Sequence, residues 1–189
     1  VNVSGDTRGL QLGVVNIAGK MSGAQVGLVN ISEEMNGVPI GLVSISKDGQ
    51  NGLQLWADEL SPFNLGVSMG TKYFYTLLTG GLRPLEDCGC TRWHAGFGFG
   101  GTLPLELLSL FVKLDLTAST LFQGAGPDMV LGGKNVLGRA RLILGWQPVP
   151  EFALFVGVSS NVLLSERQLD PQLAIADMVF QDSVASSSY

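Results

Sequence analysis

The sequence predicts an all-β protein, with a short β-solenoid that leads into an antiparallel β-barrel or barrel-like sheet and then a short C-terminal helix. Three observations support this fold: a fourteen-residue repeat near the N-terminus, long runs of alternating apolar and polar residues after Pro62, and 26 glycines among 189 residues. We expect a repeat region over residues 1–60, a sheet domain over 61–166, and a helix with a polar tail over 167–189.

The repeat is short and regular. Residues 9–17 (GLQLGVVNI) recur as residues 23–31 and again as 37–45, with a spacing of fourteen both times. A shortened fourth copy at residues 52–56 comes one residue late and indicates that the repeat is ending. All coils of a solenoid are equivalent, whereas successive turns of an up-and-down sheet lie at opposite ends, so a single period favours the solenoid. Antiparallel hairpins that continue into the next sheet remain the alternative.

Amide side chains recur at fixed places in this repeat. In a solenoid, Gln11 and Gln25 would stack at one level, and Asn16 and Asn30 at another. Stacked amides of this kind form ladders of hydrogen bonds between successive coils. We expect Pro39 and Ser44, which take the glutamine and asparagine positions in the third unit, to interrupt these ladders.

The segments after Pro62 alternate between an apolar face and a polar or glycine-rich face. Runs of about ten such residues have the length of membrane-crossing β-strands, which need roughly 9–11 residues. The apolar face, which we expect to meet lipid or a partner, carries Trp93, Phe97, Phe99, Leu110, Leu114, Leu142, Trp146, Phe152, Leu154 and Val156. The polar face, which we expect to line a lumen, carries Lys72, His94, Lys113, Asp115, Arg139 and Arg141.

Aromatic residues near the strand ends agree with a membrane barrel. Trp93, Trp146, Phe152, Tyr73 and Tyr75 would form interfacial girdles if they lie on the apolar face. The alternative is a soluble sandwich or barrel in which the apolar face forms the core and the charged face is wet. Glycines on a wet face would weaken the strands without shielding anything, which favours lipid on the apolar side.

The strand count leaves closure of the barrel open. We count about six alternating strands after Pro62, whereas the smallest membrane barrels have about eight. The remaining strands would have to come from the repeats, from residues before Val1 or from another chain. Since the chain starts at Val1 without a leader pattern, we expect a mature product or part of a longer protein.

Composition excludes several classes of function. Charged residues are 14% of the chain, against about 25% in average soluble domains, and the net charge is −5. Nucleic acid is not expected as a partner, because its binding depends on neutralising phosphates and no run of Lys or Arg occurs. No stretch of 18 apolar residues occurs, so no membrane-spanning helix is expected.

The first repeats, residues 9–17 and 23–31, together with residues 63–75 and the GGLRP run at 80–84, resemble the bacterial surface-repeat proteins. Members of that family carry tandem Gly-x-Gln-Leu-x-Gly-Leu-Val-Asn repeats ahead of a β-rich C-terminal half. The resemblance covers roughly residues 9–103, with fewer repeats than is typical of the family. It implies a secreted, envelope-associated protein of a double-membraned bacterium, and it supplies no catalytic residues.

Few residues are candidates for chemistry. In an oxidising envelope Cys88 and Cys90 would form a disulfide, with free thiols or a metal site as alternatives; zinc needs four ligands and only His94 is near in sequence. Arg139 and Arg141 share a face and would either pair with Asp115 or bind an anion. The glycine-rich run at 96–101 has no helix after it, so no nucleotide cofactor is expected.

The last expected element is a short helix, with Asp170 as N-cap, Pro171 at the first position and an end near Phe180. It would dock on its own sheet, close the barrel mouth or contact a neighbouring subunit.

Taken together, the sequence predicts a non-enzymatic structural or interaction protein at the bacterial outer membrane or cell surface. The expected partners are outer-membrane lipid, other envelope proteins or further copies of the chain, in an assembly that needs neither metal nor cofactor. A small outer-membrane pore or a ligand-carrying barrel is the alternative.

Overall fold

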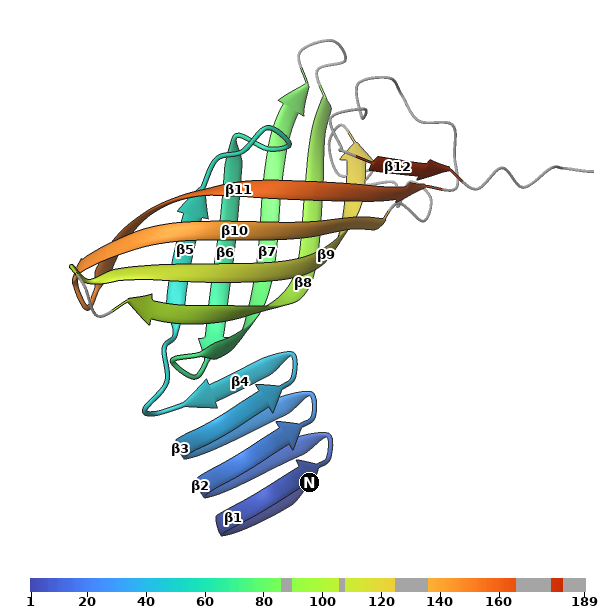
Figure 1. Ribbon diagram of the computed structural model, residues 1–189. Coiled ribbons are helices and arrows are strands. Elements are labelled where there is room, and N and C mark those ends of the chain that lie inside the picture. The colour runs from blue at the N-terminus through green and yellow to red at the C-terminus, as the bar shows by residue number, and fades with distance from the viewer. Residues whose placement is uncertain (86–89, 106–107, 125–135, 166–177, 182–189) are drawn as a thin grey trace, which may run out of the picture.

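The computed structural model describes residues 1–85, 90–105, 108–124, 136–165 and 178–181. Within these residues it contains strands and no helix, arranged in two sheets (Figure 1). The first sheet contains β1 (Asn2–Leu12), β2 (Val15–Val26), β3 (Val29–Ile40) and β4 (Val43–Ser46). The second contains β5 (Gly52–Trp56), β6 (Phe63–Gly70), β7 (Phe74–Leu85), β8 (Cys90–Leu105), β9 (Leu110–Gly124), β10 (Val136–Val149), β11 (Phe152–Ser165) and β12 (Met178–Gln181). The all-β class is confirmed.

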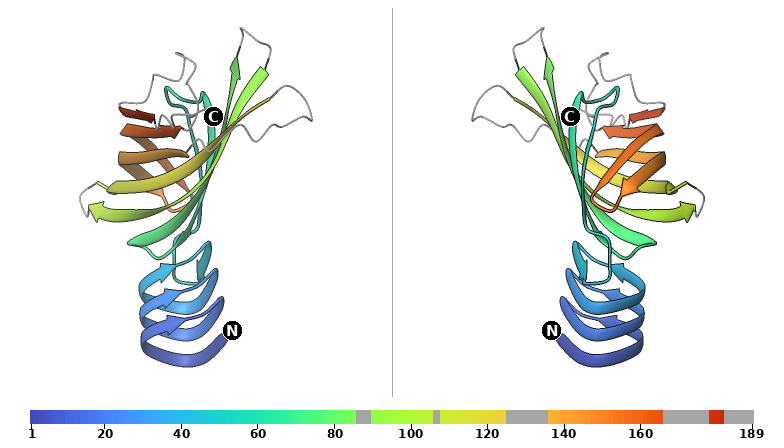
Figure 2. Two further views of the ribbon diagram at one scale, coloured as in Figure 1. Left: turned by 90° about the vertical axis from the view of Figure 1, so that its right-hand side faces the viewer. Right: turned by 90° about the vertical axis from the view of Figure 1, so that its left-hand side faces the viewer.

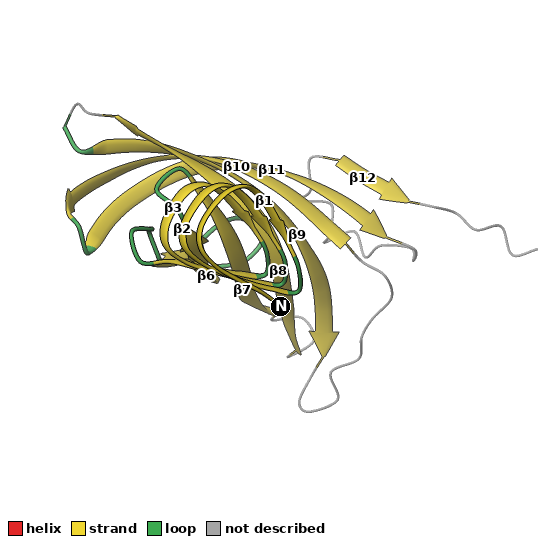
Figure 3. Ribbon diagram, turned by 90° about the horizontal axis from the view of Figure 1, so that it is seen from below, coloured by secondary structure: helices red, strands yellow, loops and turns green. Residues whose placement is uncertain are grey.

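The first sheet is a β-solenoid of about three turns. Its strands are parallel and each residue pairs with the residue fourteen positions later, as in Asn2 with Asn16 and Asn16 with Asn30. The strands curve around a common axis, which Figure 2 shows from two sides and Figure 3 shows from below. The fourteen-residue period is therefore one coil, and the alternative of antiparallel hairpins is wrong.

Glycine occupies one corner of the coil for a steric reason. Gly9 and Gly23 have φ angles of 107° and 136°, which side chains rarely adopt. A Cβ atom on Gly23 would lie 2.0 Å from the carbonyl oxygen of Gly9 in the coil before it. Gly37 is under the same restriction, because its Cβ atom would lie 1.8 Å from the Gly23 oxygen. The coils can stack at the strand spacing only if this corner carries no side chain.

Amide ladders fill the inside of the solenoid. Gln25 Nε2 donates to Gln11 Oε1 at 2.8 Å, and Asn16 Nδ2 donates to Asn30 Oδ1 at 2.9 Å. Asn30 Nδ2 in turn donates to Ser44 Oγ at 3.3 Å, so Ser44 extends the ladder and the expected interruption there is wrong. A serine can take the place of asparagine at this end of the ladder because its hydroxyl oxygen also accepts a hydrogen bond.

The solenoid ends earlier than the repeat in the sequence indicates. Strand β5, the expected fourth copy, pairs antiparallel with β6 and belongs to the second sheet. The last coil docks instead on the β6–β7 end of that sheet, where Thr76 Oγ1 donates to the Gly41 oxygen at 2.9 Å. Gly49 lies against the same end, since a Cβ atom there would be 1.9 Å from the Gly70 oxygen.

The second sheet has the strand order β12-β11-β10-β9-β8-β7-β6-β5. Strands β5 to β11 form an antiparallel meander that curls into a half-barrel (Figures 1 and 3). A barrel-like sheet was expected, and the described strands form this open version of it.

The C-terminal helix predicted up to Phe180 is not shown. Residues 166–177 lie outside the described residues, and Met178–Gln181 forms strand β12, parallel to the end of β11. Residues Val162–Ser165 of β11 provide backbone hydrogen-bond partners for Met178–Gln181. A helix signal in the local sequence contains no information about such a distant strand.

The curl gives the second sheet an exposed outer face and a covered inner face. The outer face carries the apolar residues: Leu114, Leu142, Trp146 and Phe152, for example, are all about half exposed. The inner face carries the charged residues, and Asp115 there is fully buried. In the described strands the apolar side is therefore outside, which contradicts the alternative of a soluble sandwich with an apolar core and a wet charged face.

Two residues do not lie on the face that the alternation predicts. Tyr75 was expected in an outer aromatic girdle but is buried on the inner face, because β7 begins at Phe74 after a bend that resets the alternation. Lys72 was expected in the lumen but lies exposed in that bend between β6 and β7. Tyr73, also in the bend, is exposed as expected.

Among the described residues, no helix is long and apolar enough to cross a membrane.

Candidate functional site: the inner polar cluster and the seam of the half-barrel

The inner face holds a cluster of charged side chains contributed by neighbouring strands. Asp115 on β9 and Arg141 on β10 are directly opposite in the ladder, and both point inward because of the alternation. Arg141 Nη2 donates to Asp115 Oδ2 at 2.6 Å, with both side chains almost completely buried. The hydroxyl of Tyr75 on β7 donates to the other oxygen of Asp115. The expected pairing with Asp115 is thus present for Arg141, where it joins three strands, but not for Arg139, whose ion pair is with Asp58.

Arg139 extends this cluster toward the end of the sheet. Its Nε donates to Asn161 Oδ1 on β11 at 2.9 Å, and its Nη1 forms an ion pair with Asp58 Oδ2 at 2.8 Å. Asp58 is also the acceptor for the Trp56 indole N–H at 3.1 Å. The Trp56 ring lies 4.1 Å beneath the guanidinium of Arg141, close enough for a cation–π contact.

The segment after β5 brings partners that the sequence analysis missed. Asp58 Oδ1 accepts from the backbone N–H groups of Leu60 and Ser61, which holds a tight turn. Glu59 Oε1 accepts from Ser159 Oγ at 3.0 Å and Asn161 Nδ2 at 3.4 Å. An aspartate followed by a serine and a proline is a turn signal in the sequence, but nothing local identifies partners 81 to 102 residues away.

We call the set Tyr75, Asp115, Arg139, Arg141, Trp56, Asp58, Glu59, Ser159 and Asn161 the inner polar cluster. Its hydrogen bonds run from β7 across β9, β10 and β11 to the segment that follows β5. The two ends of the half-barrel are therefore linked by side chains even where their backbones do not pair. Buried charges of this kind are stable only when each has partners, as these do.

His94 and Lys113 lie on the same face outside this cluster. His94 is buried, with Nδ1 at 3.4 Å from Ser61 Oγ. The ammonium group of Lys113 lies over the rings of Tyr75 and Phe111, at 5.2 and 5.0 Å from their centroids. The only side chain in hydrogen-bond range of His94 in the described residues is the Ser61 hydroxyl. No group of three potential metal ligands occurs in the part of the chain that the structure describes.

The cysteine prediction stays untested. Cys88 lies outside the described residues, and for Cys90 the structure describes its place at the start of β8 and not its side chain. The expected disulfide is therefore still a prediction.

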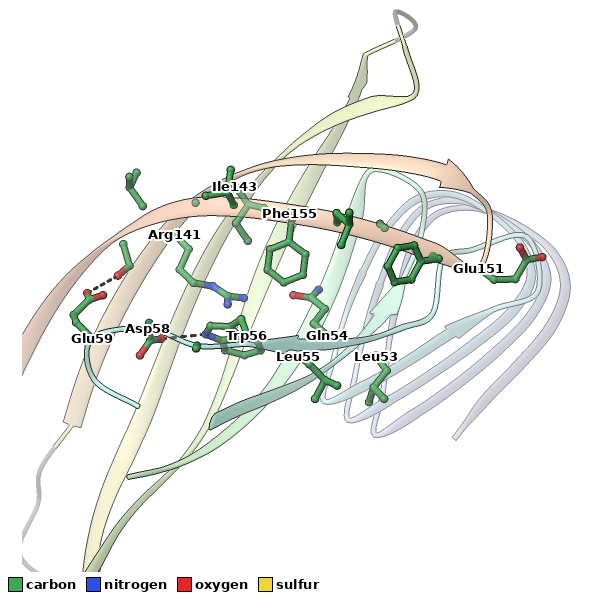
Figure 4. Close-up of a pocket in the computed structure, with 18 residues that line it drawn as sticks. Leu53, Gln54, Leu55, Trp56, Asp58, Glu59, Arg141, Ile143, Glu151 and Phe155 are labelled. Atoms are coloured by element: carbon green, nitrogen blue, oxygen red, sulfur yellow. Dashed lines mark hydrogen bonds between the residues drawn. The ribbon is translucent and has the colours of Figure 1, made fainter. Parts of the chain in front are cut away.

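The two ends of the half-barrel leave a seam between β5 and the first part of β11. Within the described residues, β5 pairs on one side with β6, and β12 covers β11 only from Val162 to Ser165. A cavity of about 840 Å³ occupies this seam (Figure 4). Its lining residues come from Leu53–Glu59, from Arg141 and Ile143 of β10, and from residues 151–159.

The cavity is amphipathic. Its inner part is formed by Trp56, Gln54, Arg141, Ile143 and Phe155, whose side chains converge in Figure 4. Its outer part is formed by exposed apolar side chains: Leu53, Leu55, Phe152, Leu154, Val156 and Val158. The volume lies in the range of small-molecule sites, about 300–1,000 Å³.

Two buried donors at this cavity have no hydrogen-bond partner among the described residues. They are Nε2 of Gln54, a residue that is 7% exposed, and Nε of Arg141, which is 5% exposed. Buried donors without an acceptor are unfavourable by about 1–3 kcal/mol each. Both residues line the cavity, so an acceptor oxygen that reached these donors would remove this cost.

The other exposed surface with a regular pattern is the solenoid. Val3, Ile17, Ile31 and Ile45 lie at equivalent positions in successive coils and are exposed. Ion pairs also connect neighbouring coils, at 3.2 Å from Lys20 Nζ to Glu34 and at 2.5 Å from Lys47 Nζ to Glu33. The hydrogen bond and charge of Glu34 raise the pKa of Lys20, and those of Lys47 lower the pKa of Glu33. Because these pairs are exposed, they contribute little to stability.

Comparison of the chain with protein-family models, with curated proteins and with solved structures gives no match. The functional argument therefore depends on the geometry of the chain itself.

Proposed function

We propose that this protein is a non-enzymatic structural or interaction protein of a bacterial envelope, with its half-barrel in the outer membrane and its solenoid projecting from it. The observation that carries the proposal is the sorting of side chains on the second sheet. The outer face is apolar and exposed on strand after strand, whereas Asp115, Arg139 and Arg141 are inside and paired. Burial of that outer face in hydrocarbon would remove its apolar surface from water without burying an unpaired charge.

Aromatic side chains support the membrane placement. Trp93, Trp146 and Phe152 lie near strand ends on the outer face, about half exposed. Tryptophan favours the boundary between hydrocarbon and water, because its apolar ring and its polar N–H group are both satisfied there.

The solenoid supports the interaction role. Its exposed row of Val3, Ile17, Ile31 and Ile45 is an aliphatic strip that crosses successive coils. A partner envelope protein or a second copy of the chain could cover this strip, which gives the assembly part of the proposal its physical basis.

A conducting pore is less well supported than a structural role. The residues that would line its lumen, Asp115, Arg139 and Arg141, are paired with each other or with Tyr75, Asp58 and Asn161. These hydrogen bonds and ion pairs connect strands across the inner face. The polar groups are therefore better suited to holding the sheet in its curled form than to conducting ions. The ligand-carrying alternative is favoured by a different observation, the cavity at the seam.

The membrane placement can be tested with the natural fluorophores. The chain has three tryptophans, of which Trp93 and Trp146 lie on the outer face and Trp56 on the inner side. We expect protein reconstituted in vesicles of brominated phospholipid to lose most of its tryptophan fluorescence, and we expect Trp93→Phe with Trp146→Phe to remove the share of that quenching that comes from the two outer tryptophans. Complete recovery of the protein in the aqueous fraction after a salt wash, without detergent, would refute the placement.

The assembly part has a separate test. Chemical crosslinking in cells should give discrete products larger than the chain, and Ile31→Asp in the aliphatic strip should remove them. A monomer under all conditions would contradict this part of the proposal.

A further inference from the structure

We propose that the seam cavity is a binding site for a single acyl chain, whose carboxyl or ester oxygens accept hydrogen bonds from Gln54 and Arg141. The inference goes beyond the structural role, since it assigns a ligand class to one site. The inference depends on the proposed membrane placement in one respect: that placement would make membrane lipid a source of the acyl chain.

The first argument is the pair of unused donors. Gln54 Nε2 and Arg141 Nε come from different strands, β5 and β10, and both line the same cavity. Two neighbouring donors are engaged: Arg141 Nη2 is bonded to Asp115, and the Trp56 indole N–H is bonded to Asp58. An acceptor that reached either donor would remove its desolvation penalty.

The second argument is the shape and chemistry of the rest of the cavity. Beyond the donors the walls are Trp56, Phe155 and Ile143, and the rim is formed by Leu53, Leu55, Phe152, Leu154 and Val156. A ligand that fills this volume needs a long apolar part that emerges at the outer face. A sugar or a nucleotide would leave many polar groups against these apolar walls, whereas an acyl chain would not.

The third argument concerns charge. Arg141 is compensated by Asp115, and Arg139 by Asp58, whereas Glu59 and Glu151 also line the cavity, so its lining offers no excess of positive charge. A head group with one or two acceptor oxygens suits this environment better than a multiply charged phosphate. The shared chemistry is therefore that of a fatty acid or of the acyl ester of a membrane lipid.

The test uses Trp56, which forms the floor of the cavity. In protein carrying Trp93→Phe and Trp146→Phe, 9,10-dibromostearate should quench the remaining fluorescence in a saturable manner, and unbrominated stearate should reverse the quenching. A second arm with vesicles of brominated phospholipid identifies the source. Quenching by the free acid alone indicates a fatty-acid site, and quenching by the vesicles indicates an acyl chain of membrane lipid. Absence of saturable quenching in both arms would overturn the proposal.

Matched variants locate the contact. Gln54→Leu removes a donor at the cavity, and we expect it to weaken stearate binding about three- to tenfold, the fold-change for loss of one hydrogen bond. Gln147→Leu is the control, because Gln147 lies outside the cavity and donates to the Pro150 oxygen. Equal affinities for the two variants would contradict the assignment of Gln54.

A third variant guards against misfolding of Gln54→Leu. Ala153→Phe places a ring into the cavity from β11 and should reduce binding without touching either donor. Failure of the acyl-chain proposal can be distinguished from failure of the membrane placement. A protein that is soluble without detergent and still binds stearate would refute the membrane placement and leave the acyl-chain site intact.

Discussion

Replacement of Asp115 by asparagine tests whether the inner polar cluster holds the half-barrel together. Asp115 has no exposed surface, and its two oxygens accept from Arg141 and from the hydroxyl of Tyr75. Asp115→Asn keeps the size of the side chain but leaves the Arg141 guanidinium buried without a counter-ion. Removal of one partner from a buried ion pair costs about 3–5 kcal/mol in general.

The structure places this variant at the lower end of that range. The face of Trp56 remains against the guanidinium, and cation–π contacts with desolvated cations contribute about 2 kcal/mol. The asparagine can still accept one hydrogen bond. We therefore expect the free energy of unfolding to fall by about 3 kcal/mol.

The assay is a urea titration followed by far-UV circular dichroism, with the double variant Asp115→Asn, Arg141→Gln alongside. Because the double variant buries no unpaired charge, we expect it to regain a large part of the lost stability. Glu34→Gln, which breaks an exposed pair with Lys20, is the control and should change stability little. A fall of less than about 1 kcal/mol for Asp115→Asn, or a double variant as unstable as the sum of the single ones, would refute the reasoning.

The remaining predictions concern the solenoid and the outer face. Gly23→Ala should unfold the solenoid, because the Cβ atom of the alanine would lie 2.0 Å from a backbone oxygen. Gly5→Ala is the control and should be tolerated, because the space around Gly5 is open. Limited proteolysis of the two variants measures the difference. Asn30→Ala should destabilise the solenoid by about 2 kcal/mol in a urea titration, because buried partners in its ladder lose their hydrogen bonds. Leu114→Lys on the outer face should lower stability in lipid by about 2–4 kcal/mol if that face meets hydrocarbon, and a neutral effect in refolding titrations into vesicles would count against the membrane placement.

Local periodicity accounts for what could be predicted of the fold. The interval between Asn16 and Asn30 is one coil of the solenoid, because stacked coils place identical side chains in contact. The alternation around Leu114 and Asp115 placed apolar and charged residues on opposite faces of the sheet, since successive side chains of a strand point in opposite directions. Both signals depend on neighbours in sequence and are visible without a structure.

The failures occur where local pattern and tertiary contact disagree. Strand β5 continues the repeat motif in sequence, but it pairs with β6 because the last coil docks on the sheet and redirects the chain. Met178–Phe180 belong to the predicted helix, but Met178–Gln181 pairs beside the end of β11 as a parallel strand. Tyr75 and Lys72 were misplaced because a bend after β6 resets the alternation.

By itself the sequence determined the coil length, the strand character of the chain and which side of each long strand is apolar. The tertiary structure alone decided that Trp56, Asp58 and Glu59 meet β10 and β11, and that a cavity with two free donors lies at the seam. The physical reason is that periodicity depends only on residues near in sequence, and therefore gives the direction of a side chain relative to its own strand. The curl of the whole sheet sets which distant segment it meets.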